Sequence, residues 1–285
     1  RTAEWTCISR ALSSLEPASN CYRSDDYIAL LLLPDFLKLL IHIPWIRRYF
    51  SRVAAPEGMY EYVIARTKYI DAVFKEVLDA RFDQILTFGA GFDTRALRFQ
   101  DVVGPTKIFE LDVPITQNAK IRQYQKRGLS IPPNVVFIPI DFENDPLSVK
   151  LEKAGFGTFR RSLFVLEGLL MYLRPESVAE TFRIIRDFAG EGSQIVFDYV
   201  YASVLRHEGQ YYGERKIAES VAKAGEEWNF GIEEGKIEEF LSTYDLRLCD
   251  HRNAHELEQI YFKDASGKIV GRVNGTHCLV RAMKV

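Results

Sequence analysis

Two glycines mark the part of this sequence where binding and chemistry are most strongly indicated. Gly89 and Gly91 follow the apolar run 84–88, and good helix formers come after them. Glycine reaches backbone angles that other residues avoid, and it lets a ligand approach the main chain closely. A helix that starts just after the turn adds unpaired N–H groups and partial positive charge. The sequence therefore predicts an anionic or acceptor-rich ligand at residues 89–93.

The turn does not complete the dinucleotide fingerprint Gly-x-Gly-x-x-Gly, because Thr94 stands at the third glycine position. In that fingerprint the third glycine lets the helix and strand pack closely around a pyrophosphate. The threonine argues against NAD or FAD and favours a nucleoside without a pyrophosphate, of which S-adenosylmethionine is the common example. A strand, turn and helix opening near Asp93 or Thr94 is by itself also frequent in α/β folds that bind nothing there.

Acidic residues stand where the later predicted strands end. Glu110 and Asp112 close the second strand, roughly 20 residues after the turn, within reach of ribose hydroxyls. Strand alternation places both on one face, so the ribose acid stays open between them. Asp141 and Phe142 follow the third strand, where a carboxylate can accept an adenine amino proton and a ring can cover the base. Glu167 ends the fourth strand and would face the cofactor's ammonium group or the substrate.

The elements that position these residues alternate between strands and helices from residue 84 onward. Strands are predicted at 84–88, 107–111, 135–140, 162–166 and 194–199, and helices at 94–99, 115–127, 146–154 and 175–188. This alternation indicates right-handed crossovers and a doubly wound, mostly parallel α/β sheet with helices on both faces. The sequence after residue 199 adds predicted helices at 212–224, 233–244 and 255–262, and predicted strands at 246–250 and 276–283. In such a sheet the ligand binds at the carboxyl ends of the strands.

Residues 1–83 differ from the rest, because their apolar residues recur at helical spacing throughout. We expect them to form a helical cap packed on a core of residues 84–285, the two making one compact unit. Arg66, in the last predicted helix of the cap, could point toward the glycine turn. A solvated surface position is the commoner outcome for an arginine with such spacing.

Composition and charge narrow the possible functions. The 285 residues are 47% hydrophobic and 27% charged, as in an ordinary soluble globular protein. The formal net charge of −2 gives no reason to expect binding to nucleic acid or to a membrane. The apolar stretch 28–46 contains prolines and charged residues, whereas a bilayer span needs about 20 mostly apolar residues. The four cysteines form no C-x-x-C pair and no signal-peptide pattern is evident, so we expect reduced thiols, no metal and a cytoplasmic protein.

The sequence resembles the leucine carboxyl methyltransferase family and its bacterial and archaeal small-molecule O-methyltransferase relatives. The opening helical region is similar, and the specific motifs span residues 64 to 173 in the family's order and spacing. They are Ile64-Ala65-Arg66-Thr67 with Ile70-Asp71, Gly89-Ala90-Gly91-Phe92-Asp93-Thr94-Arg95, Glu110-Leu111-Asp112-Val113-Pro114 with Gln117 and Lys120, Asp141-Phe142, and Glu167-Gly168-Leu169-Leu170-Met171-Tyr172-Leu173.

The resemblance implies S-adenosylmethionine as cofactor and a Rossmann-like, seven-stranded methyltransferase sheet under a helical cap. It also implies the roles of the site residues. Arg66 would pair with the cofactor carboxylate, Gly89, Ala90 and Gly91 would approach through the backbone, Asp112 would hold the ribose, Asp141 and Phe142 would flank the adenine, and Glu167 would lie near the methionyl part.

The family's protein-phosphatase branch has an early lysine on the cofactor carboxylate, and this sequence departs from that pattern. Arg10 and Arg23 stand at different spacings from Asp25-Asp26, and no lysine matches. We therefore favour a small-molecule methyl acceptor over a protein tail. A monomer or a homodimer is expected.

The reaction implied by the resemblance is displacement of the sulfonium methyl group by an acceptor oxygen. A carboxylate acceptor is ionised near neutral pH and needs no base, whereas a hydroxyl benefits from one. Spacing singles out no base among Asp198, Tyr199, Tyr201 and His207, so no catalytic residue is assigned and a carboxylate is the first choice. Aromatic residues after the fifth strand, including Trp228, could line an acceptor pocket or belong to the core. The alternatives are a protein C-terminal carboxyl methyltransferase, a nicotinamide-dependent oxidoreductase and a non-catalytic cofactor-binding protein.

Overall fold

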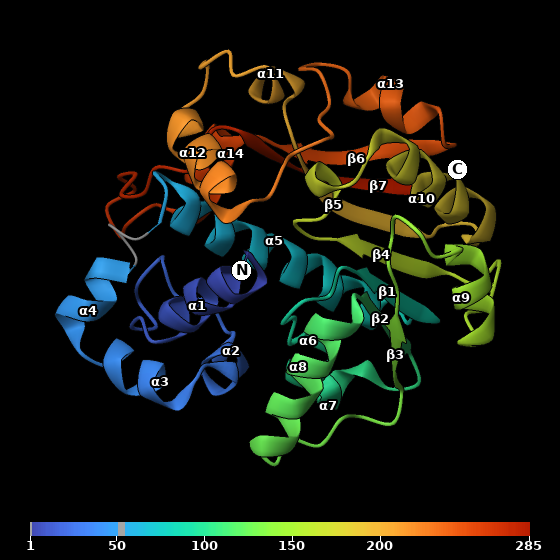
Figure 1. Ribbon diagram of the computed structural model, residues 1–285, viewed down its shortest axis with the longest axis horizontal. Coiled ribbons are helices and arrows are strands. Elements are labelled where there is room, and N and C mark those ends of the chain that lie inside the picture. The colour runs from blue at the N-terminus through green and yellow to red at the C-terminus, as the bar shows by residue number, and fades with distance from the viewer. Residues whose placement is uncertain (1, 51–54) are drawn as a thin grey trace.

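The computed structural model describes residues 2–50 and 55–285 and contains a seven-stranded sheet with helices on both faces (Figure 1). The strands run across the sheet in the order β3-β2-β1-β4-β5-β7-β6. They are β1 (Gln84–Phe88), β2 (Lys107–Asp112), β3 (Val135–Pro139), β4 (Ser162–Leu166), β5 (Gln194–Val200), β6 (Leu246–Arg252) and β7 (His277–Lys284). Strands β1 to β5 pair in parallel, and β7 is antiparallel to both of its neighbours. The predicted fold class is confirmed.

The helices before the sheet gather at the left of Figure 1, beside the start of a long helix that leads into the sheet. They are α1 (Thr2–Ser14), α2 (Tyr27–Leu32), α3 (Asp35–Ile41), α4 (Pro44–Tyr49) and the long α5 (Met59–Asp79). The later helices are α6 (Arg95–Arg98), α7 (Gln100–Val103), α8 (Pro114–Lys126), α9 (Leu147–Lys153), the 3₁₀ turn η2 (Leu170–Tyr172), α10 (Pro175–Phe188), α11 (Ala202–Leu205), α12 (Glu214–Ala224), α13 (Ile237–Ser242) and α14 (Ala254–Tyr261).

The expectation that residues 1–83 are helical throughout is wrong for residues 15–26 and 55–58, which form turns and bends. For residues 1 and 51–54 the expectation lies outside the described part of the chain. Pro17 cannot continue the hydrogen-bonded ladder of α1, and its carbonyl accepts from Asn20 N at 2.9 Å in a turn. The next helix then needs its own cap, and Asp26 Oδ1 accepts from Ala29 N at 3.1 Å. The proposed division of the chain at residue 83 stays a prediction, because α5 contacts α1 as well as α7 and α14.

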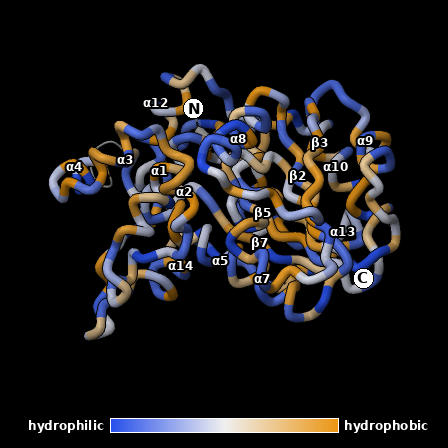
Figure 2. Tube along the Cα trace, turned by 90° about the horizontal axis from the view of Figure 1, so that it is seen from below, coloured by the Kyte–Doolittle hydropathy of each residue, from blue (hydrophilic) through white to orange (hydrophobic). Residues whose placement is uncertain are grey.

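Two apolar cores flank the sheet, because successive side chains of a strand point to opposite faces. One core packs against α1, α2, α5 and α14 and includes Ile85 and Leu279. The other packs against α9, α10 and α13 and includes Leu86 and Val280. Figure 2 shows the apolar residues of β5 and β7 in the middle of the molecule. The central strands are thus buried on both faces, which leaves their carboxyl ends as the place for polar side chains.

Some apolar residues of α3 and α4 remain at the surface, with Phe36 66% and Trp45 71% exposed. Across the described part of the chain, none of the helices has both the length and the hydropathy needed to cross a bilayer.

Candidate active site

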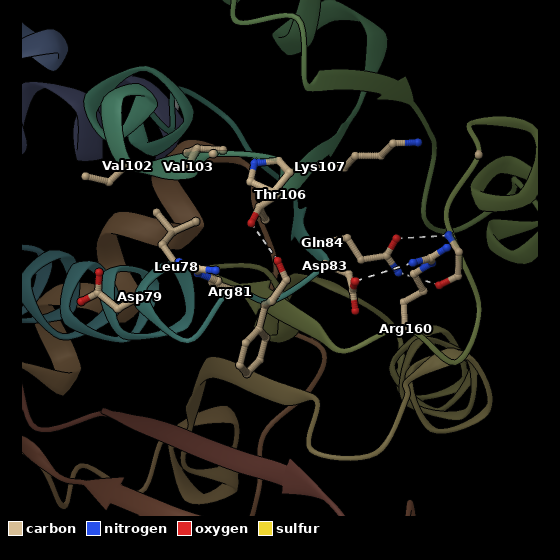
Figure 3. Close-up of a pocket in the computed structure, with 15 residues that line it drawn as sticks. Leu78, Asp79, Arg81, Asp83, Gln84, Val102, Val103, Thr106, Lys107 and Arg160 are labelled. Carbon is tan, nitrogen blue, oxygen red and sulfur yellow. Dashed lines mark hydrogen bonds and ion pairs between the residues drawn. The ribbon is translucent and has the colours of Figure 1, made fainter.

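Two cavities lie at opposite ends of the parallel strands, one at the amino ends and one at the carboxyl ends. A cavity of about 890 Å³ opens at the amino ends of β1 and β2 and is lined by residues that include Asp83, Gln84 and Thr106 (Figure 3). Polar groups there are bound to the cavity's own walls: Gln84 Nε2 donates to Gly157 O at 2.6 Å, and Thr106 Oγ1 donates to Phe82 O at 2.7 Å. The second cavity, of about 500 Å³, lies at the carboxyl ends, where open α/β sheets bind ligands. We call it the carboxyl-edge cavity.

The carboxyl-edge cavity brings together most of the site residues predicted from the sequence. Its lining includes Arg66, Gly89, Ala90, Gly91, Asp112 and Glu167. Asp141 and Phe142 are not among the described residues that line it. Asp141 is exposed, and the Phe142 ring packs on Phe88 with 6.1 Å between centroids. Their predicted contact with adenine stays a prediction.

The glycine turn has the backbone that the sequence predicted. Gly89 has φ +61° and Gly91 has φ +48°, in the left-handed region that other residues rarely adopt. A Cβ on Gly89 would lie 3.1 Å from Leu169 Cδ1, so the turn is also closely packed. Asp93 Oδ1 accepts from Arg95 N at 2.7 Å, while the Thr94 hydroxyl donates to Asp26 Oδ1 at 2.6 Å. Asp93 therefore satisfies a backbone N–H at the start of α6.

The two acids at the end of β2 have different surroundings. Glu110 Oε2 accepts from Lys120 Nζ at 2.6 Å, and Glu110 is not among the described lining residues. Asp112 lines the cavity and accepts from the backbone N–H groups of Gly91 and Val113. A carboxylate has about four acceptor positions, so Asp112 retains capacity for ligand hydroxyls. Burial raises the pKa of Asp112, and the two N–H donors oppose that shift.

A chain of buried ion pairs runs beside the cavity from α1 to β5. Its links, between 2.5 and 3.4 Å long, are Arg10–Asp26, Asp26–Arg98, Arg98–Asp71, Asp71–Arg95, Arg95–Asp93, Arg95–Glu167, Glu167–Arg66 and Arg66–Asp198. We call these nine residues the arginine–carboxylate chain. Each of their side chains is at most 16% exposed. The arginine–carboxylate chain contains four guanidinium groups and five carboxylates, so it has one excess negative charge. It therefore favours a ligand that carries positive charge.

Glu167 follows β4, the central strand of the sheet, and Arg66 on α5 forms an ion pair with it. Burial would raise the pKa of Glu167, but the guanidinium groups of Arg95 and Arg66 together bring it below its ordinary value. Burial likewise disfavours charge on Arg66, but Asp198 and Glu167 raise its pKa, so both groups stay ionised. Arg66 uses Nε and Nη1 for these two acids. Within the described residues its Nη2 makes no hydrogen bond.

The sequence did not predict Arg10 or His277 as ligand contacts, and it left the role of Trp228 open. Arg10 lines the cavity from α1, where its Nη2 donates to Phe92 O at 2.8 Å. Trp228 and His277 line it from the loop after α12 and from the start of β7. For Trp228 the sequence left open an acceptor pocket or the core, and in the structure it lines the cavity. The position of His277 next to β5 depends on strand order, which local spacing does not reveal.

The four candidate bases do not lie among the described lining residues. Asp198 is fully buried and accepts from Arg66, from the Tyr62 hydroxyl at 2.8 Å and from Gly168 N at 2.6 Å. Tyr199 belongs to the core on the other face of the sheet. Tyr201 is in the same core, and His207 is exposed. In the part of the chain that is described, no cluster of three or more His, Cys, Asp or Glu side chains is suited to hold a metal ion.

A sheet with an antiparallel β7 inserted between β5 and β6, and a glycine turn facing a strand-end acid, define the class of α/β methyltransferases. The family model for leucine carboxyl methyltransferase matches residues 3–186. The chain therefore belongs to the leucine carboxyl methyltransferase family, and the resemblance seen in its motifs is confirmed.

Curated relatives agree with this assignment. YktD of Bacillus subtilis (strain 168), provisionally named an S-adenosyl-L-methionine-dependent methyltransferase, is 26% identical over 70% of this chain and 66% of its own length. A similarly named protein of Mycolicibacterium smegmatis (strain ATCC 700084 / mc(2)155) is 30% identical over 75% of this chain and 70% of its own. One from Mycobacterium avium (strain 104) is matched over 52% of its length. The chain thus spans from about half to 70% of these relatives, and their names agree with the predicted enzyme class and with S-adenosylmethionine as the cofactor.

Solved structures show the same fold at low identity. A provisionally named methyltransferase from Thermobifida fusca YX has a TM-score of 0.59 at 17% identity, covering 85% of this chain and 89% of that one. A duf574 family protein from Streptomyces avermitilis MA-4680 has a TM-score of 0.58 at 16% identity, covering 78% and 84%.

Proposed function

We propose that the protein transfers the methyl group of S-adenosylmethionine to an oxygen atom of a small organic molecule. The observation that carries this proposal is the carboxyl-edge cavity, which has two chemically different ends. One end has the glycine turn after β1 and Asp112 at the end of β2, and the other has Trp228 and His277, which pack together at the start of β7. The first suits a nucleoside, and the second suits a partly apolar acceptor.

The residues at the first end fit the proposed cofactor. The glycine turn permits close backbone approach, and Asp112 has free acceptor positions for ribose hydroxyls. The excess carboxylate of the arginine–carboxylate chain favours a sulfonium cation. The indole Nε1 of Trp5, on the cavity wall, is buried and finds no hydrogen-bond partner among the described residues, so it is a donor available to a ligand.

The proposed roles of the remaining site residues follow from their charge. Arg66, through Nη2, and Arg10 would hold the cofactor carboxylate, while Asp93 and Glu167 would face its ammonium group. The predicted adenine side is the loop after β3, where Ile140 N donates to Asp112 O at 2.9 Å and residues 141–142 follow at once.

Bound S-adenosylmethionine supplies an activated methyl group, and the contribution of the protein is positioning. Residues of α1, α5 and α12 line the cavity and would exclude water from the acceptor. Holding the two reacting atoms in line can supply much of the rate without covalent help from the protein. A cavity of about 500 Å³ suits a small molecule better than a folded protein or an RNA.

The proposal is tested by incubating the protein with methyl-labelled cofactor and three separate pools: metabolite extract, total RNA and total protein. We expect label in the metabolite pool, and mild alkaline hydrolysis then distinguishes an ester from an ether. Label confined to RNA or protein would refute a small-molecule acceptor. Calorimetry with S-adenosylhomocysteine and with NADH tests the cofactor separately, and binding of NADH alone would refute the methyltransferase assignment.

A further inference from the structure

His277 lies at the end of the carboxyl-edge cavity that we assign to the acceptor, so this inference rests on the proposed function. It is the first residue of β7 and pairs with Val200 at the carboxyl end of β5. Strands β4 and β5 separate β7 from β1. At about 4.8 Å per strand, His277 lies roughly 14 Å along the sheet edge from the glycine turn. Cofactor and acceptor can therefore lie end to end between them.

A hydrogen-bond chain determines which ring nitrogen of His277 carries the proton. Asn274 Nδ2 donates to Glu57 O at 2.9 Å, so its Oδ1 faces Thr276. The Thr276 hydroxyl donates to that Oδ1 at 2.6 Å. Because this hydroxyl proton is already used, Thr276 Oγ1 can only accept from His277 Nδ1, which lies 2.7 Å away. The proton is on Nδ1, and the lone pair of Nε2 is free.

His277 lines the cavity, and because its Nδ1 lies against Thr276, Nε2 is the ring nitrogen left for a ligand. The Tyr62 ring packs against the imidazole at a tilt of 34° with 4.4 Å between centroids, and the Trp228 ring is nearly perpendicular to it at 5.4 Å. His277 is 3% exposed and lines the cavity, yet Nε2 makes no hydrogen bond within residues 2–50 and 55–285. Burial is the main cause that lowers the pKa of His277 to about 4. The charge of Asp198 opposes this shift, and the charge of Arg66 adds to it. The imidazole is neutral at pH 7.

We propose that Nε2 of His277 accepts the hydrogen bond of a hydroxyl group on the methyl acceptor and takes its proton during transfer. The oxygen uses a lone pair to form the new bond to the methyl carbon, and the carbon–sulfur bonding pair stays on sulfur. The oxygen–hydrogen bonding pair stays on oxygen, and the proton moves to Nε2 and then to solvent. The products are a methyl ether and a neutral thioether.

The same arrangement disfavours a carboxylate acceptor. A carboxylate has no proton to donate, so its oxygens would face the lone pair of Nε2 and the excess carboxylate of the arginine–carboxylate chain. With a hydroxyl acceptor, the positive charge of the site passes from sulfonium to imidazolium and stays near Asp198. The walls formed by Val63, Met171 and Trp228 are apolar, and Trp228 Nε1 is buried without a partner in the described chain. The acceptor class is thus a phenol or alcohol with an aromatic or apolar body.

The first test uses matched probes that differ only in the reacting group, namely pairs of aryl alcohols and aryl carboxylates such as 2-naphthol and 2-naphthoate. We expect kcat/KM to favour the hydroxyl member by at least about tenfold, and His277→Gln to lower it by about 100-fold or more, the usual contribution of a positioned base. His207→Gln, an exposed position, is the control. Equal or better transfer to the carboxylates, or no transfer to any hydroxyl probe, would overturn the proposal.

The second test reads the proton position directly by ¹⁵N NMR of histidine-labelled protein. Wild type should show His277 as the neutral Nδ1–H form, and Thr276→Val should move the proton to Nε2 and reduce transfer to the hydroxyl probe. A proton on Nε2 in wild type would overturn the proposal. Calorimetry with S-adenosylhomocysteine should give the same affinity in all these proteins. Loss of that binding in wild type would instead refute the proposed function.

Discussion

Asp112 is the residue whose removal most directly tests the nucleoside end of the site. Asp112→Ala should weaken binding of S-adenosylhomocysteine by about 1–3 kcal/mol, because ribose hydroxyls would lose a charged acceptor. Isothermal titration calorimetry measures the affinity, and Asp101→Ala, an exposed acid on α7, is the matched control. Unchanged affinity in the Asp112 variant would remove this residue from the ribose site.

Gly89 combines backbone strain with crowding, and a second glycine separates the two effects. Gly128 also has a positive φ, of +64°, but a Cβ there would meet nothing within 4 Å. Both Gly89→Ala and Gly128→Ala should lower the free energy of unfolding by about 1–2 kcal/mol, the cost of a side chain at positive φ. Only Gly89→Ala should also weaken S-adenosylhomocysteine binding. Equal affinities in the two variants would show that the turn does not approach the cofactor.

Residue types and spacing predicted those site residues that lie next to a strand recognisable in the sequence. Gly89, Gly91 and Asp112 are close to strands that the sequence identified, and the structure puts them in one cavity. The choice between Asp112 and Glu110 came from the family resemblance, because both share a strand face and only Lys120 separates their surroundings. His277 could not be found this way, since its place beside β5 is set by long-range pairing.

At the scale of elements, the arginine–carboxylate chain joins the helices α1, α5 and α6 to the carboxyl ends of β4 and β5. Asp71, on α5, accepts from Arg95 and twice from Arg98. Asp71→Asn should lower the free energy of unfolding by about 3–5 kcal/mol, because two guanidinium groups would stay buried without full compensation. Urea unfolding measures this.

The control for that variant is the exposed pair of Lys236 and Glu239 on α13, whose contact is 2.8 Å. Glu239→Gln should change the free energy of unfolding by less than about 1 kcal/mol. If Asp71→Asn lowered the free energy of unfolding no more than this control does, the arginine–carboxylate chain would not contribute to stability as proposed.

Strands were predicted better than helices, for a physical reason. The strands β1, β2, β4 and β5 are buried on both faces along almost their whole length. The predicted ends of all seven strands agree with the structure within two residues. The one-turn elements α7, α11 and η2 were not predicted, because three or four residues carry no measurable periodicity. The predicted helix 233–244 is shorter in the structure, at Ile237–Ser242. Gly235, just before this helix, has φ +77°, which is not a helical backbone angle.

At the scale of the whole molecule, stability should depend on pH through its buried ionisable groups. The pKa of His277 falls from 6.5 to about 4 on folding. Between these values the unfolded chain binds a proton that the folded chain does not, so the free energy of unfolding falls as the pH is lowered. The loss from pH 7 to pH 4 should be about 3 kcal/mol. Below about pH 4.5, protonation of Glu167, whose pKa is lowered, adds to it.

The predicted pH dependence of stability is tested by urea unfolding of wild type and His277→Gln at several pH values between 7 and 4. The variant should lose most of the pH dependence above pH 4.5, because glutamine does not titrate. His255→Gln, at a 74% exposed side chain, should keep it. Parallel curves for wild type and the His277 variant would contradict the prediction.

The position of β7 also bears on the order in which the molecule can be assembled. Strand β7 comes after the other six in the chain but lies inside the sheet, and β6 pairs with β7 alone among the described strands. Until residues 277–284 have been synthesised, β5 keeps an unpaired edge and β6 has no partner, a state prone to association with other chains. The residue that we assign to the acceptor is the first of that strand. A nascent or truncated chain therefore cannot display the acceptor end of the cavity, and the onset of activity should coincide with closure of the sheet.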